Sequence, residues 1–397
     1  MAAATGTRAF LYGAVLASAA LQGCRSVDEA GPHRPPLLRP SAPETVWDGE
    51  QARAPFLIVP FGADELAIAD QDAVFALDPA TGEARRLGRA GQGPGEFVSV
   101  AGLGPADDGG LVIVDGRQLR ASRMDAEGDF VASWQLRPPP TLGNASSGPI
   151  LMAGDGLLRM VWSAGVIRVD GVPDAVALVE HDLVSGTSTT VAEWTGTAWV
   201  ETPWAMMPAS PATGPPPWAA DARDRRVRWA THAGCVLSRG AAPDAAADSS
   251  CAPIPRVPLK AFVPADSMLA AASVRSTMRE VLARKHEFQD LAGDHDAVQR
   301  LVVDDGGCVW LRIVKDDAAY DPMLEFTVPA TRPAEYEWWV WDTGRDRLAG
   351  RIAVPSSFDP QLIRDGVIYG FIDQSDHTRG VARARFDAAA LGTCEVP

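Results

Sequence analysis

Residues 111–136 read LVIVDGRQLRASRMDAEGDFVASWQL, and their pattern decides the fold. Residues 111–115 are an apolar run, and residues 119–125 form a second strand pattern that ends at an Asp. A turn at Glu127-Gly128 then precedes a third strand pattern over residues 129–136. Short apolar runs with a period of two, separated by turn residues, are typical of antiparallel strands. The segment therefore predicts three neighbouring strands.

The same order of strands and turns recurs along the chain. Further copies begin near residues 65, 157, 226, 308 and 367, the fourth copy being weaker and the sixth incomplete. The Asp that precedes the turn recurs at Asp78, Asp125, Asp182, Asp342 and Asp387. The spacings are 47, 57, 160 and 45 residues, and the long one holds a further copy plus an insertion. Four-stranded units of ~40–50 residues are typical of β-propellers, so we expect an all-β, six-bladed β-propeller.

The insertion is predicted to be helical and to lie between the fourth and fifth blades, over about residues 264–290. Asp266 or Ser267 is a suitable N-cap residue, and Val274, Met278 and Val281 share one face of the predicted helix. We expect this helix to lie against the wall of the propeller or to cover one of its mouths.

Composition limits the possible partners. Hydrophobic residues make up 46% of the 397 residues, so the chain can bury a sizeable core. Its 36 Lys and Arg against 51 Asp and Glu give a net charge of −15. Phosphate binding requires a basic surface, so a nucleic-acid partner is not expected.

The N-terminal residues predict export. Residues 9–20 are apolar and precede Leu21-Gln-Gly-Cys24, which resembles a bacterial lipobox. We expect residues 1–23 to be a lipoprotein signal peptide, residues 24–46 a Pro-rich tether, and residues 47–397 the propeller. Cys24 becomes the acylated first residue, and the protein is lipid-anchored in the cell envelope, at the outer membrane or the periplasmic face. The alternative is a secretory signal that happens to contain a Cys.

The other four cysteines predict two disulfides. An even number of cysteines in an exported protein favours pairing, with three possible connectivities. Cys235 and Cys251 flank a turn-rich segment and fall opposite each other if the two arms form a hairpin. Cys308 with Cys394 then follows by elimination, and the alternative is four reduced, buried thiols.

Two segments resemble a known family. Residues 87–97, LGRAGQGPGEF, closely resemble the Gly-rich signature that ends the first blade in six-bladed, NHL-like β-propeller lipoproteins of bacteria. Residues 304–310, DDGGCVW, resemble a second pattern of the same family. The resemblance extends over about residues 47–386, and it implies the propeller fold and an envelope location. Most members of this group have no assigned biochemical role.

No catalytic residue, metal ligand or cofactor is predicted. Pro94 interrupts the Gly-rich segment and a strand pattern follows it, so blade-to-blade turn chemistry explains it better than a dinucleotide loop. His286 and Asp290 approach a zinc-protease helix motif, but the second His is missing. They are therefore interpreted as a solvated pair on a helix surface.

Aromatic residues between the third and fourth blades are the candidates for ligand contact. Trp199, Trp204 and Trp218 lie in a connection that is also rich in Met and Pro. Exposed aromatic side chains there suit sugar, peptide or apolar ligands. The alternative is that they fill the wall between these two blades.

Two function classes follow. The first is a monomeric binding module, not an enzyme, whose loops contact an envelope protein or glycan, with the membrane reached through the lipid anchor only. The alternative is a hydrolase or lyase with a metal such as calcium in the central channel. Its acidic candidates are Asp70, Asp115 and Asp304, but no His joins them at matching positions.

Overall fold

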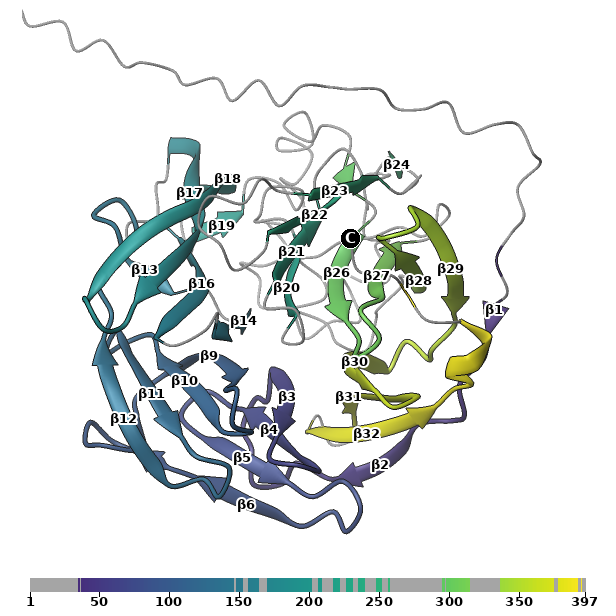
Figure 1. Ribbon diagram of the computed structural model, residues 1–397, viewed down its shortest axis with the longest axis horizontal. Coiled ribbons are helices and arrows are strands. Elements are labelled where there is room, and N and C mark those ends of the chain that lie inside the picture. Colours follow the sequence, from purple (N-terminus) through teal and green to yellow (C-terminus); the bar gives the residue numbers. More distant parts are fainter. Residues whose placement is uncertain are drawn as a thin grey trace, which may run out of the picture. The chain divides into compact units, whose positions relative to one another are not determined.

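The computed structural model divides the chain into two units, residues 1–34 and residues 35–397, and all described residues belong to the second unit. The structure describes residues 35, 37–145, 148–152, 156–163, 170–201, 206–208, 217–221, 226–230, 235–239, 248–251, 256–257, 295–296, 298–314, 336–374, 378–391 and 394. Within these residues, six antiparallel sheets of four or more strands follow one another around a ring (Figure 1). The predicted six-bladed β-propeller is therefore confirmed.

The first three blades contain these strands. Blade 1 consists of β3 (Leu57–Phe61), β4 (Glu65–Ala69), β5 (Val74–Leu77) and β6 (Ala84–Leu87). Blade 2 consists of β9 (Val100–Pro105), β10 (Leu111–Asp115), β11 (Arg120–Met124) and β12 (Phe130–Gln135), with β14 (Gly148–Pro149) parallel to β9. Blade 3 consists of β15 (Leu151–Met152), β16 (Leu157–Ser163), β17 (Asp170–Asp182) and β18 (Thr187–Glu201), with β13 (Asn144–Ala145) and β19 (Met206–Pro208) at its margins.

The other three blades are built in the same way. Blade 4 consists of β20 (Trp218–Asp221), β21 (Arg226–Ala230), β22 (Cys235–Arg239) and β23 (Asp248–Cys251). Blade 5 consists of β26 (Val298–Val303), β27 (Val309–Val314), β28 (Tyr336–Asp342) and β29 (Arg347–Ile352), with β1 (Leu37–Leu38) parallel to β29. Blade 6 consists of β30 (Phe358–Arg364), β31 (Val367–Asp373), β32 (Arg379–Arg385) and β2 (Glu44–Trp47).

Blade 6 combines strands from both ends of the propeller. In Figure 1 the purple strand β2 lies along the yellow strand β32, and the two pair in antiparallel register from Glu44 opposite Arg383 to Trp47 opposite Val381. The Glu44 carboxylate also lies 3.0 Å from the Arg383 guanidinium. The ring therefore includes residues 44–46, which precede the start expected from the sequence at residue 47.

The core consists of six apolar clusters, each between two neighbouring blades. One joins blades 1 and 2, for example, and another joins blades 5 and 6. Because both faces of a blade are covered, a central strand such as β10 is buried over its whole length. The strict apolar and polar alternation of a half-exposed strand is absent there.

Four of the repeated Asp residues lie in the turns between the third and fourth strands of a blade, and the fifth, Asp387, caps the 3-10 turn after β32. The Asp78 carboxylate accepts the Ala80 amide at 2.7 Å, and the Asp182 carboxylate accepts the amides of Val184 and Ser185 at 2.9 Å. These backbone hydrogen bonds hold the pKa of both carboxyls below the usual value. The repeat seen in the sequence is therefore a repeated turn.

The Gly-rich segment forms the connection between blades 1 and 2. It contains the short parallel pair β7 (Arg89–Ala90) and β8 (Glu96–Phe97). The Arg120 guanidinium of blade 2 donates to the carbonyls of Gln92 and Gly93 at 2.9 and 3.0 Å. Gly95 has a φ of 68°, a conformation that favours glycine.

Smaller elements complete the described part of the chain. They are the pair β24 (Arg256–Val257) and β25 (His295–Asp296) and a 3-10 turn at Ala388–Ala390. The helix predicted over residues 264–290 lies outside the described residues. No helix in the described ranges is long and apolar enough to cross a membrane.

Both predicted disulfides are confirmed. Cys235 and Cys251 lie directly opposite each other on β22 and β23, and their sulfurs are bonded. The second bond joins Cys308, in the turn before β27, to Cys394 near the end of the chain.

The two disulfides are expected to differ in their effect on stability. Replacing Cys308 and Cys394 together by Ala should lower the free energy of unfolding by about 4.5 kcal/mol, because the bond closes a separation of 86 residues. The same change at Cys235 and Cys251, with a separation of 16, should cost about 3 kcal/mol. Guanidinium unfolding of both double variants measures the difference, and an equal loss would contradict the loop-length explanation.

The strand that closes the ring is also expected to be essential for stability. Trp47 is buried and its ring lies 5.4 Å from that of Phe75 in blade 1. Trp47→Ala should therefore lower the free energy of unfolding by about 3–5 kcal/mol. Val184, which is 85% exposed, serves as the control, and Val184→Ala should change stability by less than about 0.5 kcal/mol. Similar urea midpoints for the two variants would disprove this role of β2.

Candidate functional site

The inner strands of the blades enclose a central cavity of about 650 Å³. Strands β3, β20, β26 and β30 line it, together with Pro105 of β9 and the segment Gly148–Ile150. Each of these four strands is the last in its sheet, so one backbone edge faces the cavity. The volume lies within the range of small-molecule sites in proteins.

The inner strands begin at one end of the cavity, which we call the upper mouth, and end at the lower mouth. Trp218 and Arg300 lie near the starts of β20 and β26, Asp359 lies near the start of β30, and Gln361 lies in the middle of β30. Asp304 and Arg364, at the ends of β26 and β30, belong to the lower mouth.

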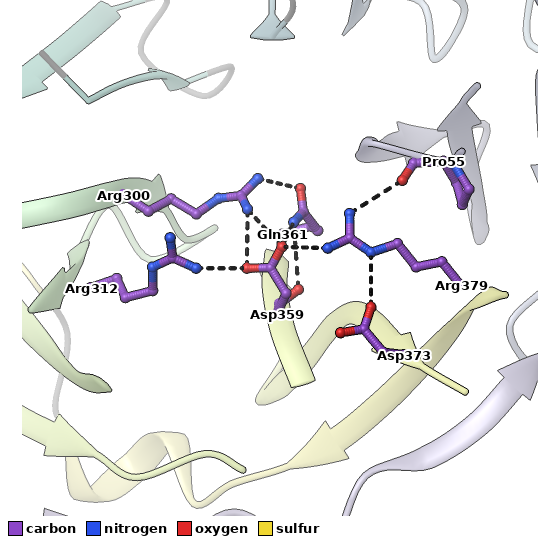
Figure 2. Close-up of polar contacts among 7 residues, drawn as sticks. All are labelled: Pro55, Arg300, Arg312, Asp359, Gln361, Asp373 and Arg379. Carbon is purple, nitrogen blue, oxygen red and sulfur yellow. Dashed lines mark hydrogen bonds and ion pairs between the residues drawn. The ribbon is translucent and has the colours of Figure 1, made fainter. Parts of the chain in front are cut away.

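Blades 5 and 6 place a polar cluster at the upper mouth. Figure 2 shows its charged and amide side chains, which come from five strands. They are Arg300 on β26, Arg312 on β27, Asp359 and Gln361 on β30, Asp373 on β31 and Arg379 on β32.

Arg300, Asp359 and Gln361 form the tightest part of the cluster. Nη1 of Arg300 donates to both carboxylate oxygens of Asp359, at 3.0 and 2.9 Å. Nη2 of Arg300 donates to Oε1 of Gln361, and Nε2 of Gln361 donates to Oδ2 of Asp359 at 2.8 Å. The three side chains therefore form a closed ring of hydrogen bonds between blades 5 and 6.

Arg379 joins this ring through longer contacts. Nη2 lies 3.8 Å from Oδ2 of Asp359, and Nε lies 3.4 Å from Oδ1 of Asp373. Nη1 donates to the Pro55 carbonyl at 3.4 Å, and the guanidinium lies 5.1 Å from the centre of the Phe371 ring. Arg379 therefore extends the cluster toward the start of blade 1.

The cluster arises from the alternation of side chains on β26. Leu301 packs into the apolar cluster shared with blade 4, whereas Val302 packs into the one shared with blade 6. Side chains two residues apart point to the same face of a strand, so Arg300 faces blade 6 together with Val302. Asp359 meets it there from β30.

Burial and neighbouring charge set the ionisation of this cluster. Burial raises the pKa of Asp359, but the guanidinium groups of Arg300, Arg312 and Arg379 outweigh it and hold that pKa below the usual value. Burial lowers the pKa of Arg300, and the positive charges of Arg312 and Arg379 act in the same direction. The positive groups at this mouth therefore repel one another.

The predicted aromatic residues have different positions. Trp218 lines the cavity, and its ring lies over Gly148, where an added Cβ would come within 3.1 Å. Trp204 and the side chain of Trp199 lie outside the described residues. Trp194 packs against Trp229 instead, with ring centres 5.7 Å apart.

The three acidic candidates for a channel metal do not come together. Asp70 accepts the amides of Arg53 and Ala54, and Asp115 accepts the amide of Val98. Asp70 follows β4 and Asp115 is the last residue of β10, and both of these second strands end at the upper mouth, whereas Asp304 lies at the lower mouth. The described residues contain no group of three or more His, Cys, Asp or Glu side chains arranged to hold a metal ion.

Asp304 has a structural role at the lower mouth. Its carboxylate accepts the Cys308 amide at 2.8 Å and the Trp310 indole N–H at 2.7 Å. Burial raises its pKa to about 6, although both donors favour the charged form. The remaining predicted positions, Cys24, His286 and Asp290, lie outside the described residues.

Ser188 and His181 in blade 3 lie close together, but His181 is protonated on the nitrogen that faces Ser188 and cannot act as its base. The Trp162 indole N–H donates to Nε2 of His181 at 2.8 Å, so Nδ1 carries the proton and faces Oγ of Ser188 at 2.7 Å. Ser188 in turn donates to the Arg137 carbonyl. His181 therefore donates to Ser188 and cannot accept its proton.

The blades and the cavity that they enclose define the protein as a six-bladed β-propeller with a central, small-molecule-sized cavity. No protein-family model and no curated protein match the chain. A member of the DUF4221 family from Bacteroides vulgatus ATCC 8482 is similar in structure, with a TM-score of 0.53 and 11% identity over 88% of this chain and 96% of that chain.

Two further solved structures are similar over most of their length. One is a candidate exported protein from Bacteroides fragilis NCTC 9343, with a TM-score of 0.49 and 11% identity over 88% of this chain and 95% of that chain. The other is a gluconolactonase from Xanthomonas campestris, with a TM-score of 0.46 and 13% identity over 91% of this chain and 99% of that chain. At these identities, the comparisons concern the fold alone.

Burial of His181 predicts a loss of stability in acid. Burial lowers its pKa to about 4, whereas an unfolded His has a pKa near 6.5. The unfolded chain therefore binds a proton before the folded protein does, and stability falls by about 3 kcal/mol as the pH drops from 6.5 through 4. The raised pKa of Asp304 increases the stability of the folded protein as the pH falls over part of this range. A variant is therefore needed to separate the effect of His181 from that of Asp304.

The measurement is the unfolding free energy of the wild type and of His181→Gln between pH 4 and 7. The difference between the two should shrink as the pH falls, because only the wild type loses the contribution of His181. The contribution of Asp304 is common to both proteins and cancels. A difference that stays constant with pH would show that His181 is not the responsible group.

Proposed function

We propose that this protein is an exported, monomeric envelope lipoprotein, anchored through Cys24, whose propeller binds the saccharide end of an envelope glycan. The ligand enters the central cavity through the upper mouth. The observation that carries this proposal is the cavity of about 650 Å³, with Trp218, Arg300 and Gln361 among its lining residues. No chemistry beyond binding is needed.

The shape of the site favours a small ligand group over a folded protein. Stable interfaces between proteins bury about 800 Å² on each partner over an extended surface, whereas this site is a concave cavity. A terminal saccharide fits such a volume, and a protein reaches it only through an inserted loop.

The lining chemistry fits a sugar. Trp218 offers an aromatic face for the apolar face of a sugar ring. Arg300 and Gln361 offer planar N–H donors and a carbonyl acceptor for ring hydroxyls. The backbone edges of the inner strands supply further donors and acceptors.

The proposed location rests on the sequence and on the two disulfides. Disulfide bonds persist in oxidising compartments such as the periplasm, which supports export. The lipobox-like Leu21-Gln-Gly-Cys24 supports lipidation of Cys24, and the residues between Cys24 and β1, which include Pro32, Pro35 and Pro36, are suited to a tether. The helix predicted over residues 264–290 is part of the same proposal.

A glycan array tests the proposed function. The labelled propeller, residues 35–397, should bind at least one class of bacterial envelope saccharide on the array. Trp218→Ala should weaken this binding about tenfold or more, because the aromatic contact in the cavity is lost. Trp194→Ala, at a Trp that is not among the cavity-lining residues, is the matched control and should bind like the wild type.

Melting curves of both variants confirm that they are folded before binding is compared. Binding of no saccharide by the wild type would reject the proposal. Equal binding by the wild type and Trp218→Ala would show that the ligand does not occupy the cavity.

A further inference from the structure

We infer that the saccharide bound by this protein carries a carboxylate, which pairs with Arg300 and Arg379 at the upper mouth. This inference rests on the proposed function and adds the chemical class of the ligand. It depends on three observations, namely the accessibility of the two guanidinium groups, the charge of the cluster, and the difference between the two mouths.

Arg300 lines the cavity and Arg379 is partly exposed beside it, whereas the carboxylate between them is covered. The side chains of Arg300 and Arg379 are 28% and 30% exposed, and that of Asp359 is 10% exposed. A ligand at the upper mouth therefore meets guanidinium N–H donors before it meets the Asp359 carboxylate. Carboxylates are the natural partners of such planar donors, since the two can form parallel hydrogen bonds.

The contacts of Arg379 in the free protein are longer than normal guanidinium hydrogen bonds. Its N–H groups lie 3.4 Å from Asp373, 3.4 Å from the Pro55 carbonyl and 3.8 Å from Asp359. Hydrogen bonds between a guanidinium and a carboxylate are normally about 2.7–2.9 Å long. A ligand carboxylate can therefore form a shorter hydrogen bond with Arg379 than its present partners do.

The cluster has an excess of positive charge. The side chains in Figure 2 carry three guanidinium groups and two carboxylates, which leaves one positive charge more than negative charges. This local excess occurs in a chain whose net charge is −15. The positive charges of Arg312 and Arg379 already act against the charged form of Arg300, so a ligand carboxylate beside these groups reduces their mutual repulsion.

The lower mouth has the opposite character. Asp304 and Asp305 line it together with Arg364, and the Arg364 guanidinium lies 3.2 Å from the carboxylate of Asp365. An anionic ligand is therefore attracted to the upper mouth and repelled by the acidic groups at the lower one. Arg364 also provides a control, since it lines the same cavity but lies at the far end of β30.

A matched pair of ligands tests the inference. Methyl β-D-glucuronide and methyl β-D-glucoside have the same ring and differ at C6, where only the first has a carboxylate. Titration calorimetry at constant ionic strength should show the glucuronide binding to the propeller at least about tenfold more tightly, the size expected for charge-assisted hydrogen bonds. Trp218→Ala should weaken both ligands.

Single Arg variants identify the groups responsible. Arg300→Gln and Arg379→Gln should each remove most of the preference for the glucuronide, whereas Arg364→Gln should keep it. Arg379→Gln is the safer variant, because its contacts in the free protein are long and its loss leaves Asp359 paired with Arg300. A melting curve for each variant excludes loss of the fold.

The outcomes separate the inference from the proposed function. Equal binding of both methyl glycosides, no binding of either, or a preference that survives Arg300→Gln and Arg379→Gln each overturns the carboxylate inference. The glycan array with Trp218→Ala decides the proposed function independently, because it does not depend on the charge of the ligand. A preference lost in both variants and kept in Arg364→Gln supports the inference.

Discussion

The pairing of β2 with β32 is the constraint on which the rest of this structure depends. Each blade is covered by a neighbour on both faces, and the six apolar clusters between blades form the core. Every blade has a neighbour on both faces only if the ring closes. Here the strand that closes it, β2, comes from the N-terminal side of the propeller. The contact of Trp47 with blade 1 then joins the last blade to the first.

Ring closure also determines what a ligand can meet. The side chains of the inner strands point mainly into the interfaces between blades, while their backbone edges face the cavity. Charged side chains line the cavity toward its two mouths, as Arg300 does at the upper mouth, where it pairs with Asp359 at the interface of blades 5 and 6. The cluster therefore has two roles, since it holds two blades together and presents guanidinium groups to the mouth.

Much of the fold could be predicted from the sequence, but the candidate site could not. In four of the six blades the outer three strands show period-two patterns and an Asp turn, and in blade 4 the hairpin pattern around Cys235 and Cys251 indicated that these two cysteines are bonded. Inner strands such as β3 and β30 were missed because a proline interrupts their pattern. Arg300 and Asp359 are 59 residues apart, and only the ring brings them together. Trp218, which lines the cavity, could be singled out from the sequence alone. A cluster of Trp residues between two blades is unusual, and it can be recognised without knowing the topology.

The closure of the ring by β2 has a consequence for the order of events during folding. Glu44 and Arg383 are separated by 339 residues, so β2, one of the first strands of the propeller to leave the ribosome, pairs with β32, which is made much later. Contacts of such long range form slowly, because a large loop must be closed first. The half-made chain therefore cannot finish its ring, and its open strand edges persist until synthesis is complete. Only when β32 has been made can β2 complete the last blade and close the ring.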